Sequence, residues 1–98
     1  MTKRKRVLLK STQRLLNLIG KRLYKLRKVN GYSLRYLSGQ VNISRQLLSR
    51  IEKGTYAGFT MGMIETICEF YDEDVMALIS DNVKWKPKLP NNINSSQP

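Results

Sequence analysis

Apolar side chains recur every three or four positions along the first third of the chain. This spacing places them on one face of an α-helix. It predicts a helix from about residue 15 to residue 29, and Gly31 suits the left-handed conformation that follows a helix end. The inward residues expected for this helix are Leu15, Leu16, Ile19, Leu23, Leu26 and Val29.

Two shorter helices are predicted next, over residues 33–41 and 44–53. Each begins at a serine, Ser33 or Ser44, whose hydroxyl can accept a hydrogen bond from the first turn. Asn42 lies between the helices and tolerates the left-handed conformation of a tight turn. The inward residues expected here are Leu34, Leu37, Val41, Leu48 and Ile51.

The remainder of the chain contains two more helical stripes and a polar tail. Residues 55–59 show no helical period and predict a loop. A fourth helix is expected from Thr60 to Tyr71, and a short fifth helix from Glu73 to Ile79. We therefore predict an all-α fold.

The length of 98 residues is that of one small domain, and the 41% apolar content is sufficient for one compact core. We expect a basic N-terminal arm over residues 1–14 and a folded domain over residues 15–80. A C-terminal extension, rich in Pro, Asn and Ser, is expected over residues 81–98.

Charge is distributed unevenly along the chain. Residues 1–53 contain 15 Lys or Arg and one acid, whereas residues 54–98 contain 3 Lys and 6 acids. A basic half of this kind favours a polyanion, and nucleic acid is the polyanion that Lys and Arg most commonly bind. A surface that serves only solubility is the alternative.

The residue types argue against several classes of function. The chain has no His and a single Cys, so we expect no enzyme, no metal site, no internal disulfide and no cofactor. The basic start is followed by only three apolar residues, 7–9, which is too few for a secretory signal. No apolar run approaches the roughly 18 residues of a membrane span. A cytoplasmic protein without a membrane partner is expected.

Two short helices joined by a tight turn, in a basic helical domain, are typical of a helix-turn-helix unit. A helical hairpin of the same length also occurs in proteins that bind no DNA. The pattern and the charge alone leave both interpretations open.

The residues themselves resemble a known family. Residues 19–27 (IGKRLYKLR), 31–38 (GYSLRYLS) and 42–54 (NISRQLLSRIEKG) are similar to the phage Cro and repressor type of helix-turn-helix, also called the xenobiotic-response-element family. The resemblance covers about residues 15–79. It implies a five-helix, lambda-repressor-like domain, a third helix in the major groove of double-stranded DNA, and a homodimer on a two-fold operator.

The third helix carries the expected base contacts, which are Arg45, Gln46, Ser49 and Arg50. Arginine can donate a fork of hydrogen bonds to guanine, and Gln46 can pair with adenine. Either arginine could instead hold a phosphate, because most protein contacts to DNA go to the backbone. Leu47 is expected to touch a thymine methyl group or to pack on its neighbours.

Phosphate contacts are expected at the starts of the second and third helices and in the loop after the third. The candidates are Ser33, Arg35, Ser44, Lys53, Thr55 and Tyr56. Leu34 departs from the family pattern, because many relatives carry a phosphate-gripping Gln there. The arm residues Lys3, Arg4, Lys5 and Arg6 could follow a groove or could be attracted without specificity.

Arg27 and Glu52 match an ion pair that the family forms between its first and third helices. Glu52 is the only acid in the first 53 residues, which favours an internal role over a surface role. A forked pair would hold the two helices together. A DNA contact by Arg27 is the alternative.

We expect a transcriptional regulator, more often a repressor than an activator in this family. The alternative is the antitoxin of a toxin pair, and the possible protein partners are a toxin or an anti-repressor. An RNA-binding or membrane-surface protein is disfavoured by the acidic second half. Part of the dimer contact is expected among Ile64, Ile67, Phe70, Tyr71, Val75, Met76 and Trp85.

Overall fold

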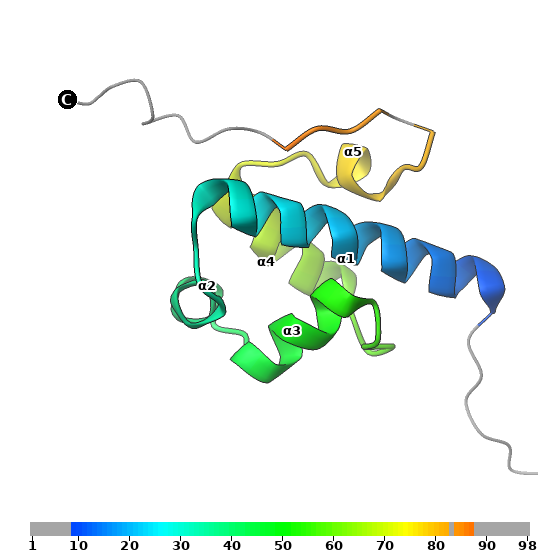
Figure 1. The fold of residues 1–98 in the computed structure, drawn as a ribbon. Coiled ribbons are helices and arrows are strands. Elements are labelled where there is room, and N and C mark those ends of the chain that lie inside the picture. The colour runs from blue at the N-terminus through cyan, green and yellow to red at the C-terminus, as the bar shows by residue number, and fades with distance from the viewer. Residues whose placement is uncertain (1–8, 83, 88–98) are drawn as a thin grey trace, which may run out of the picture.

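The computed structural model describes residues 9–82 and 84–87, which fold into five helices (Figure 1). The described residues contain no strand, and the predicted all-α fold is confirmed. The helices are α1 (Lys10–Asn30), α2 (Leu34–Val41), α3 (Arg45–Lys53), α4 (Met61–Tyr71) and α5 (Val75–Ile79).

Three of the helix starts have side-chain caps, and the sequence predicts the two that are serines. The hydroxyl of Ser33 accepts from the Tyr36 N–H at 2.9 Å, and that of Ser44 accepts from the Leu47 N–H at 3.2 Å. The Thr60 hydroxyl caps α4 in the same way. These bonds satisfy N–H groups that have no partner within the helix. Helices α2, α3 and α4 therefore begin where local chemistry places them.

Helix α1 begins at Lys10, so the start predicted near residue 15 was wrong. The extra turn has no apolar stripe and no side-chain cap, and contacts with distant parts of the chain hold it. The Gln13 amide donates to the Gly54 carbonyl at 2.8 Å, and Arg14 pairs with Asp81 at 2.9 Å. Lys10 and Arg14, expected in the basic arm, thus lie in a helix.

Helix α5 begins at Val75, two residues later than predicted. Asp72 takes a left-handed conformation with φ of 60°, which separates α4 from α5. The Asp74 carboxylate then caps α5 by accepting from the Ala77 N–H at 3.3 Å. The cap supplied by Asp74 was not anticipated.

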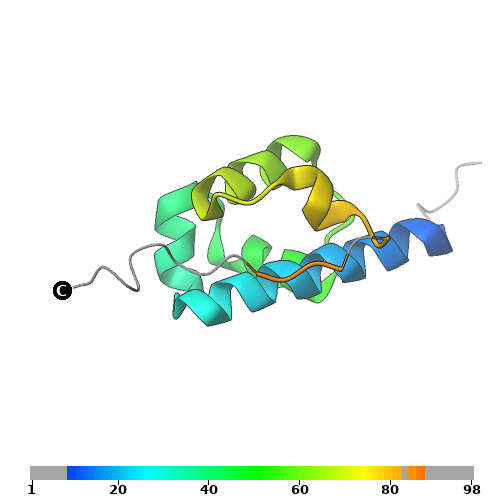
Figure 2. The same ribbon diagram turned by 90° about the horizontal axis from the view of Figure 1, so that it is seen from above.

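One core joins all five helices. Helix α1 crosses α3 and α5, and α4 lies behind α1 in Figure 1 and parallel to it in Figure 2. Leu15 and Val29, predicted to point inward, are 41% and 40% exposed. The buried apolar residues are Ile19, Leu23, Leu26, Leu37, Val41, Leu48, Ile51, Ile64, Ile67, Cys68, Tyr71 and Leu78.

Three residues that the sequence offered for a dimer contact are buried in the core of this chain. They are Ile64, Ile67 and Tyr71, so only the other four members of that set, Phe70, Val75, Met76 and Trp85, stay available for a dimer contact. Burial also raises the pKa of the Tyr71 phenol above its usual range. Met76, in contrast, is 67% exposed on α5.

Candidate nucleic-acid interface

Helices α2 and α3 form a helix-turn-helix unit held by its turn and by α1. Asn42 adopts the left-handed conformation, with φ of 58°, directly after α2. Gly20 of α1 allows close approach to α3, because a Cβ there would lie 2.6 Å from the carbonyl oxygens of Ile51 and Glu52. The orientation of α3 is thus set from both of its ends.

A hollow of about 500 Å³ lies between the first turn of α2 and the first two turns of α3. Arg35, Arg45, Gln46 and Arg50 around it are exposed, whereas Ser49 is half-buried. The structure therefore brings the four expected base-contacting residues to one surface together with Arg35. The lining residues are Leu34, Arg35, Arg45, Gln46, Ser49 and Arg50.

The loop after α3 constrains the last turn of that helix. The Arg50 guanidinium carbon lies 5.2 Å from the centre of the Tyr56 ring, a cation–π geometry. The Thr55 hydroxyl donates to the Arg50 carbonyl at 3.3 Å. Lys53 is exposed at the same end of α3. The hydrogen bond at its carbonyl and the ring beside its guanidinium group thus limit the motion of Arg50.

Both helix starts suit anions. Helix N-termini carry partial positive charge on N–H groups that have no acceptor within the helix. The caps Ser33 and Ser44 stand at these starts, and Arg35 and Arg45 follow within the first two helical residues. Two helix starts and two guanidinium groups therefore make this surface positive.

Two leucines occupy positions that the sequence left open. Leu34 is half-buried and forms an apolar wall of the hollow, so it offers no polar group to a phosphate. Leu47 is also half-buried. The arm residues Lys3, Arg4, Lys5 and Arg6 lie outside the described residues.

Arg27 and Glu52 form a forked ion pair between α1 and α3. Arg27 Nε lies 2.8 Å from Glu52 Oε2, and Nη2 lies 2.9 Å from Oε1. Arg27 Nη1 also donates to the Tyr32 carbonyl at 3.0 Å. The two side chains are only 11% and 7% exposed. The bond to Glu52 raises the pKa of Arg27, and the contact turns the carboxylate of Glu52 inward.

Several contacts that hold the helices together carry no local signal in the sequence. Arg22 Nη1 donates to the carbonyls of Ala77, Leu78 and Ser80 at 3.1, 2.8 and 2.9 Å, and so covers the end of α5. Aromatic rings also join the start of α2 to α4, with Tyr32 and Phe70 centred 5.6 Å apart. Both features join segments far apart in the sequence, so no local pattern could reveal them.

Neither a membrane-spanning helix nor a cluster of potential metal ligands occurs among residues 9–82 and 84–87. No curated protein matches the chain in sequence. A family model described as a helix-turn-helix domain matches residues 20–82, from the middle of α1 past the end of α5. The match includes every residue around the hollow between α2 and α3. The chain belongs to this helix-turn-helix domain family, whose fold is that of DNA-binding regulators.

Proposed function

We propose that this protein is a sequence-specific regulator of transcription that reads the major groove of double-stranded DNA with α3. The observation that carries the proposal is the exposed surface on which Arg45, Gln46, Ser49 and Arg50 meet Arg35. These side chains are donors and acceptors of the kinds that read base edges. We expect this activity in the cytoplasm. It needs no cofactor.

Individual roles follow from position on the helix. Arg45 and Gln46 stand in the first turn of α3, which enters a groove first, and Ser49 and Arg50 follow one turn later. The arginines suit guanine and Gln46 suits adenine. Phosphate contacts are assigned to Ser33, Arg35, Ser44, Lys53, Thr55 and Tyr56.

Repression and dimerisation are supported by the resemblance of residues 19–54 to the Cro and repressor type. A homodimer would place two copies of α3 on two related half-sites. Met61 and Met76, which are 54% and 67% exposed, are apolar residues that a dimer contact could cover. Bound to a promoter, such a dimer would block access by polymerase.

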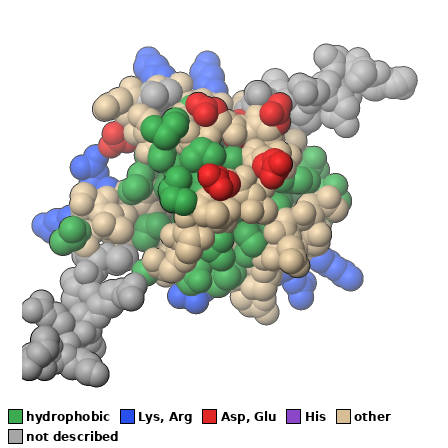
Figure 3. Space-filling model, turned by 180° about the vertical axis from the view of Figure 1, so that it is seen from behind, with side chains coloured by type: hydrophobic (Ala, Val, Ile, Leu, Met, Phe, Trp, Pro, Cys, Tyr) green, Lys and Arg blue, Asp and Glu red, His purple; other side chains and the backbone are tan. Residues whose placement is uncertain are grey.

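An antitoxin is the second candidate, and the face formed by α4 and α5 favours it. Acidic side chains gather there beside apolar ones, on the side seen from behind in Figure 3. Such a face could hold a basic protein while α3 holds DNA. A toxin-coding gene next to the gene of this protein would distinguish this candidate from a simple repressor.

Selection from a random duplex library at near-physiological salt tests the proposal. We expect enrichment of a two-fold symmetric motif, and we expect Arg50→Ala to lose preference at one position of each half-site. Lys84→Ala, which removes a charge outside the proposed interface, should enrich the same motif as the unchanged protein. Binding without any motif would refute sequence-specific regulation.

The arm makes a separate contribution that salt can measure. Residues 1–8 contain Lys3, Arg4, Lys5 and Arg6, and their removal leaves α1 intact because α1 begins at Lys10. If all four contact phosphates, deletion should reduce the slope of log affinity against log salt by up to about four. An unchanged slope would remove the arm from the interface.

A further inference from the structure

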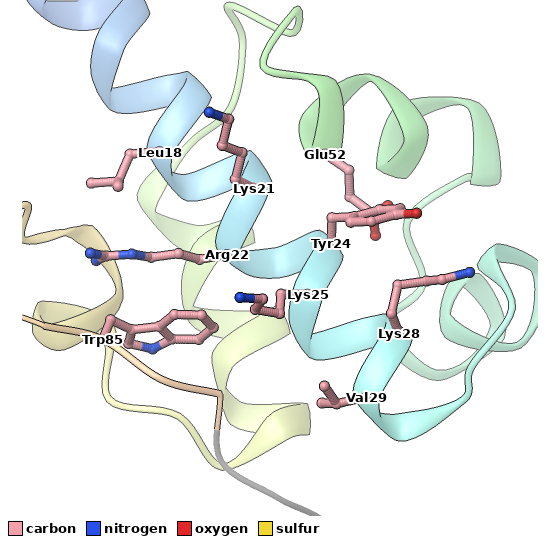
Figure 4. A pocket seen from close by; sticks show the side chains of 9 residues that line it. All are labelled: Leu18, Lys21, Arg22, Tyr24, Lys25, Lys28, Val29, Glu52 and Trp85. Carbon is pink, nitrogen blue, oxygen red and sulfur yellow. The ribbon is translucent and has the colours of Figure 1, made fainter.

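An open cavity of about 660 Å³ lies along α1, on a side that the proposed DNA interface does not use. Its walls come from α1, from Glu52 near the end of α3 and from Trp85 of the segment 84–87 (Figure 4). None of the residues around it is a proposed contact to DNA. Its volume falls within the range of small-molecule sites.

Apolar groups occupy both ends of this α1 cavity. Trp85 lies at one end and the Tyr24 ring at the other, as Figure 4 shows. Tyr24 is 48% exposed and Val29 is 40% exposed, although both are large apolar groups. Leu18 adds a further aliphatic wall. A ligand with an aromatic or aliphatic body would cover surface that now faces water.

The charge along the α1 cavity is positive. Lys21, Lys25 and Lys28 stand four and three positions apart on α1, so they share one helix face and repel one another. All three side chains are exposed. The carboxylate in the lining belongs to Glu52, which is bound to Arg27. An anion would relieve the repulsion among the three lysines.

The tryptophan wall is fixed before any ligand arrives. Trp85 Nε1 donates to Glu73 Oε1 at 3.1 Å, and the Arg22 guanidinium carbon lies 5.5 Å from the centre of the indole. Arg22 is itself held by three carbonyl groups at the end of α5. A site whose wall is already in place loses little free energy to ordering when a ligand binds.

We propose that the α1 cavity binds a small organic anion whose acidic group contacts the lysines and whose aromatic or aliphatic body lies between Tyr24 and Trp85. Inorganic phosphate or sulfate would leave the apolar ends uncovered and should therefore bind more weakly than an anion with an apolar body. A neutral molecule of the same shape would gain no ion pair with the lysines.

Three probes test the proposal on the full chain. 8-Anilinonaphthalene-1-sulfonate has fused rings and one sulfonate, N-phenyl-1-naphthylamine has the same rings without the charge, and inorganic sulfate has the charge without the rings. Fluorescence titration should show saturable binding of the sulfonate at one site. The neutral amine should bind at least about fivefold more weakly, as loss of an ion pair predicts. Sulfate at equal ionic strength should not compete.

Two variants with the same change in charge locate the site. Lys25→Glu should weaken binding of the sulfonate probe by roughly fivefold or more. Lys84→Glu, whose side chain does not line the cavity, should leave it within a factor of two. Trp85→Ala should weaken it by about threefold to tenfold. Equal losses in both lysine variants, or equal binding of the neutral amine, would overturn the proposal. Binding of duplex DNA that Lys25→Glu weakens more than Lys84→Glu would assign the lysines to nucleic acid instead.

Discussion

Two surfaces of this small domain carry opposite charge. One is formed by α2 and α3 (the α2–α3 surface), and the other is formed by α4 and α5 (the α4–α5 surface). From Leu34 to Lys53 the chain has four basic residues and one acid, whereas residues 54–82 contain six acids and no Lys or Arg. The single acid of the first surface, Glu52, is bound to Arg27. The acids around α4 and α5 gather at the opposite face (Figure 3).

This difference shows how an acidic residue can belong to a basic surface and still add little negative charge to it. An exposed carboxylate beside the hollow between α2 and α3 would repel phosphate and weaken binding. In its pair with Arg27, Glu52 instead joins α3 to α1 and adds little negative charge to the outside. If DNA binds the surface of α2 and α3, the acids of the other face would repel phosphate and so orient the molecule as it approaches.

Removing Glu52 should have the largest effect on stability. Glu52→Ala leaves the nearly buried Arg27 without its carboxylate, which should reduce the free energy of unfolding by roughly 3 to 5 kcal/mol. Glu65→Ala removes an exposed acid of α4 and should change it by less than about 0.5 kcal/mol. Urea denaturation measures both. Equal losses in the free energy of unfolding would contradict the distinction between the paired acid of one surface and the exposed acids of the other.

Gly20→Ala tests the contact that orients the basic surface. The new methyl group would meet two carbonyl groups of α3, so unfolding should become easier by about 1 to 3 kcal/mol. Gly39→Ala is the matched control, because a Cβ there meets nothing within 4 Å and alanine favours the helix. Thermal melting should move in opposite directions for the two variants. A Gly20→Ala protein as stable as the unchanged chain would show that α1 and α3 adjust freely.

Arg45→Ala and Arg50→Ala should leave the fold intact and weaken DNA binding. If each arginine donates a fork of hydrogen bonds to a base, as proposed, its loss should reduce affinity for the selected duplex by about 1 to 3 kcal/mol. Fluorescence anisotropy with matched and mismatched duplexes separates the roles. A loss that is the same on every sequence would reassign that arginine to a phosphate.

The smallest expected effect on stability comes from Cys68 of α4, a helix of the acidic surface. Burial, with help from the charges of Glu73 and Asp74, raises the pKa of the Cys68 thiol from 9.0 to about 11. The unfolded chain therefore loses this proton first, so stability should fall as pH rises from about 9 toward 11. By pH 10 the loss should be about 1 kcal/mol. Cys68→Ala should flatten that decline in urea denaturation, whereas an identical slope would show that the thiol ionises as freely when folded.

The sequence predicted what local chemistry determines. Ser33, Ser44 and Asn42 act on residues beside them, and the structure confirms α2 and α3 at the expected positions. The start of α1 was missed because Gln13 and Arg14 find their partners more than 40 residues away.

Local sequence patterns likewise predict only part of the candidate site. Arg45, Gln46, Ser49 and Arg50 could be nominated together because they share two turns of one helix. The contact of Tyr56 with Arg50 also lies within one short stretch, but its geometry depends on the path of the loop. The wall of the α1 cavity could not be predicted, because Trp85 and Arg22 of α1 are in contact but lie far apart in the sequence.

We propose that DNA binds the α2–α3 surface and not the α4–α5 surface. Titration of the isotope-labelled protein with a short duplex, followed by the backbone amide signals of an NMR spectrum, tests it most directly. We predict that the largest changes in chemical shift fall at the starts of α2 and α3 and in the loop at Thr55 and Tyr56, with α4 and α5 nearly unchanged. Changes centred on α4 and α5, or spread evenly over all five helices, would contradict it.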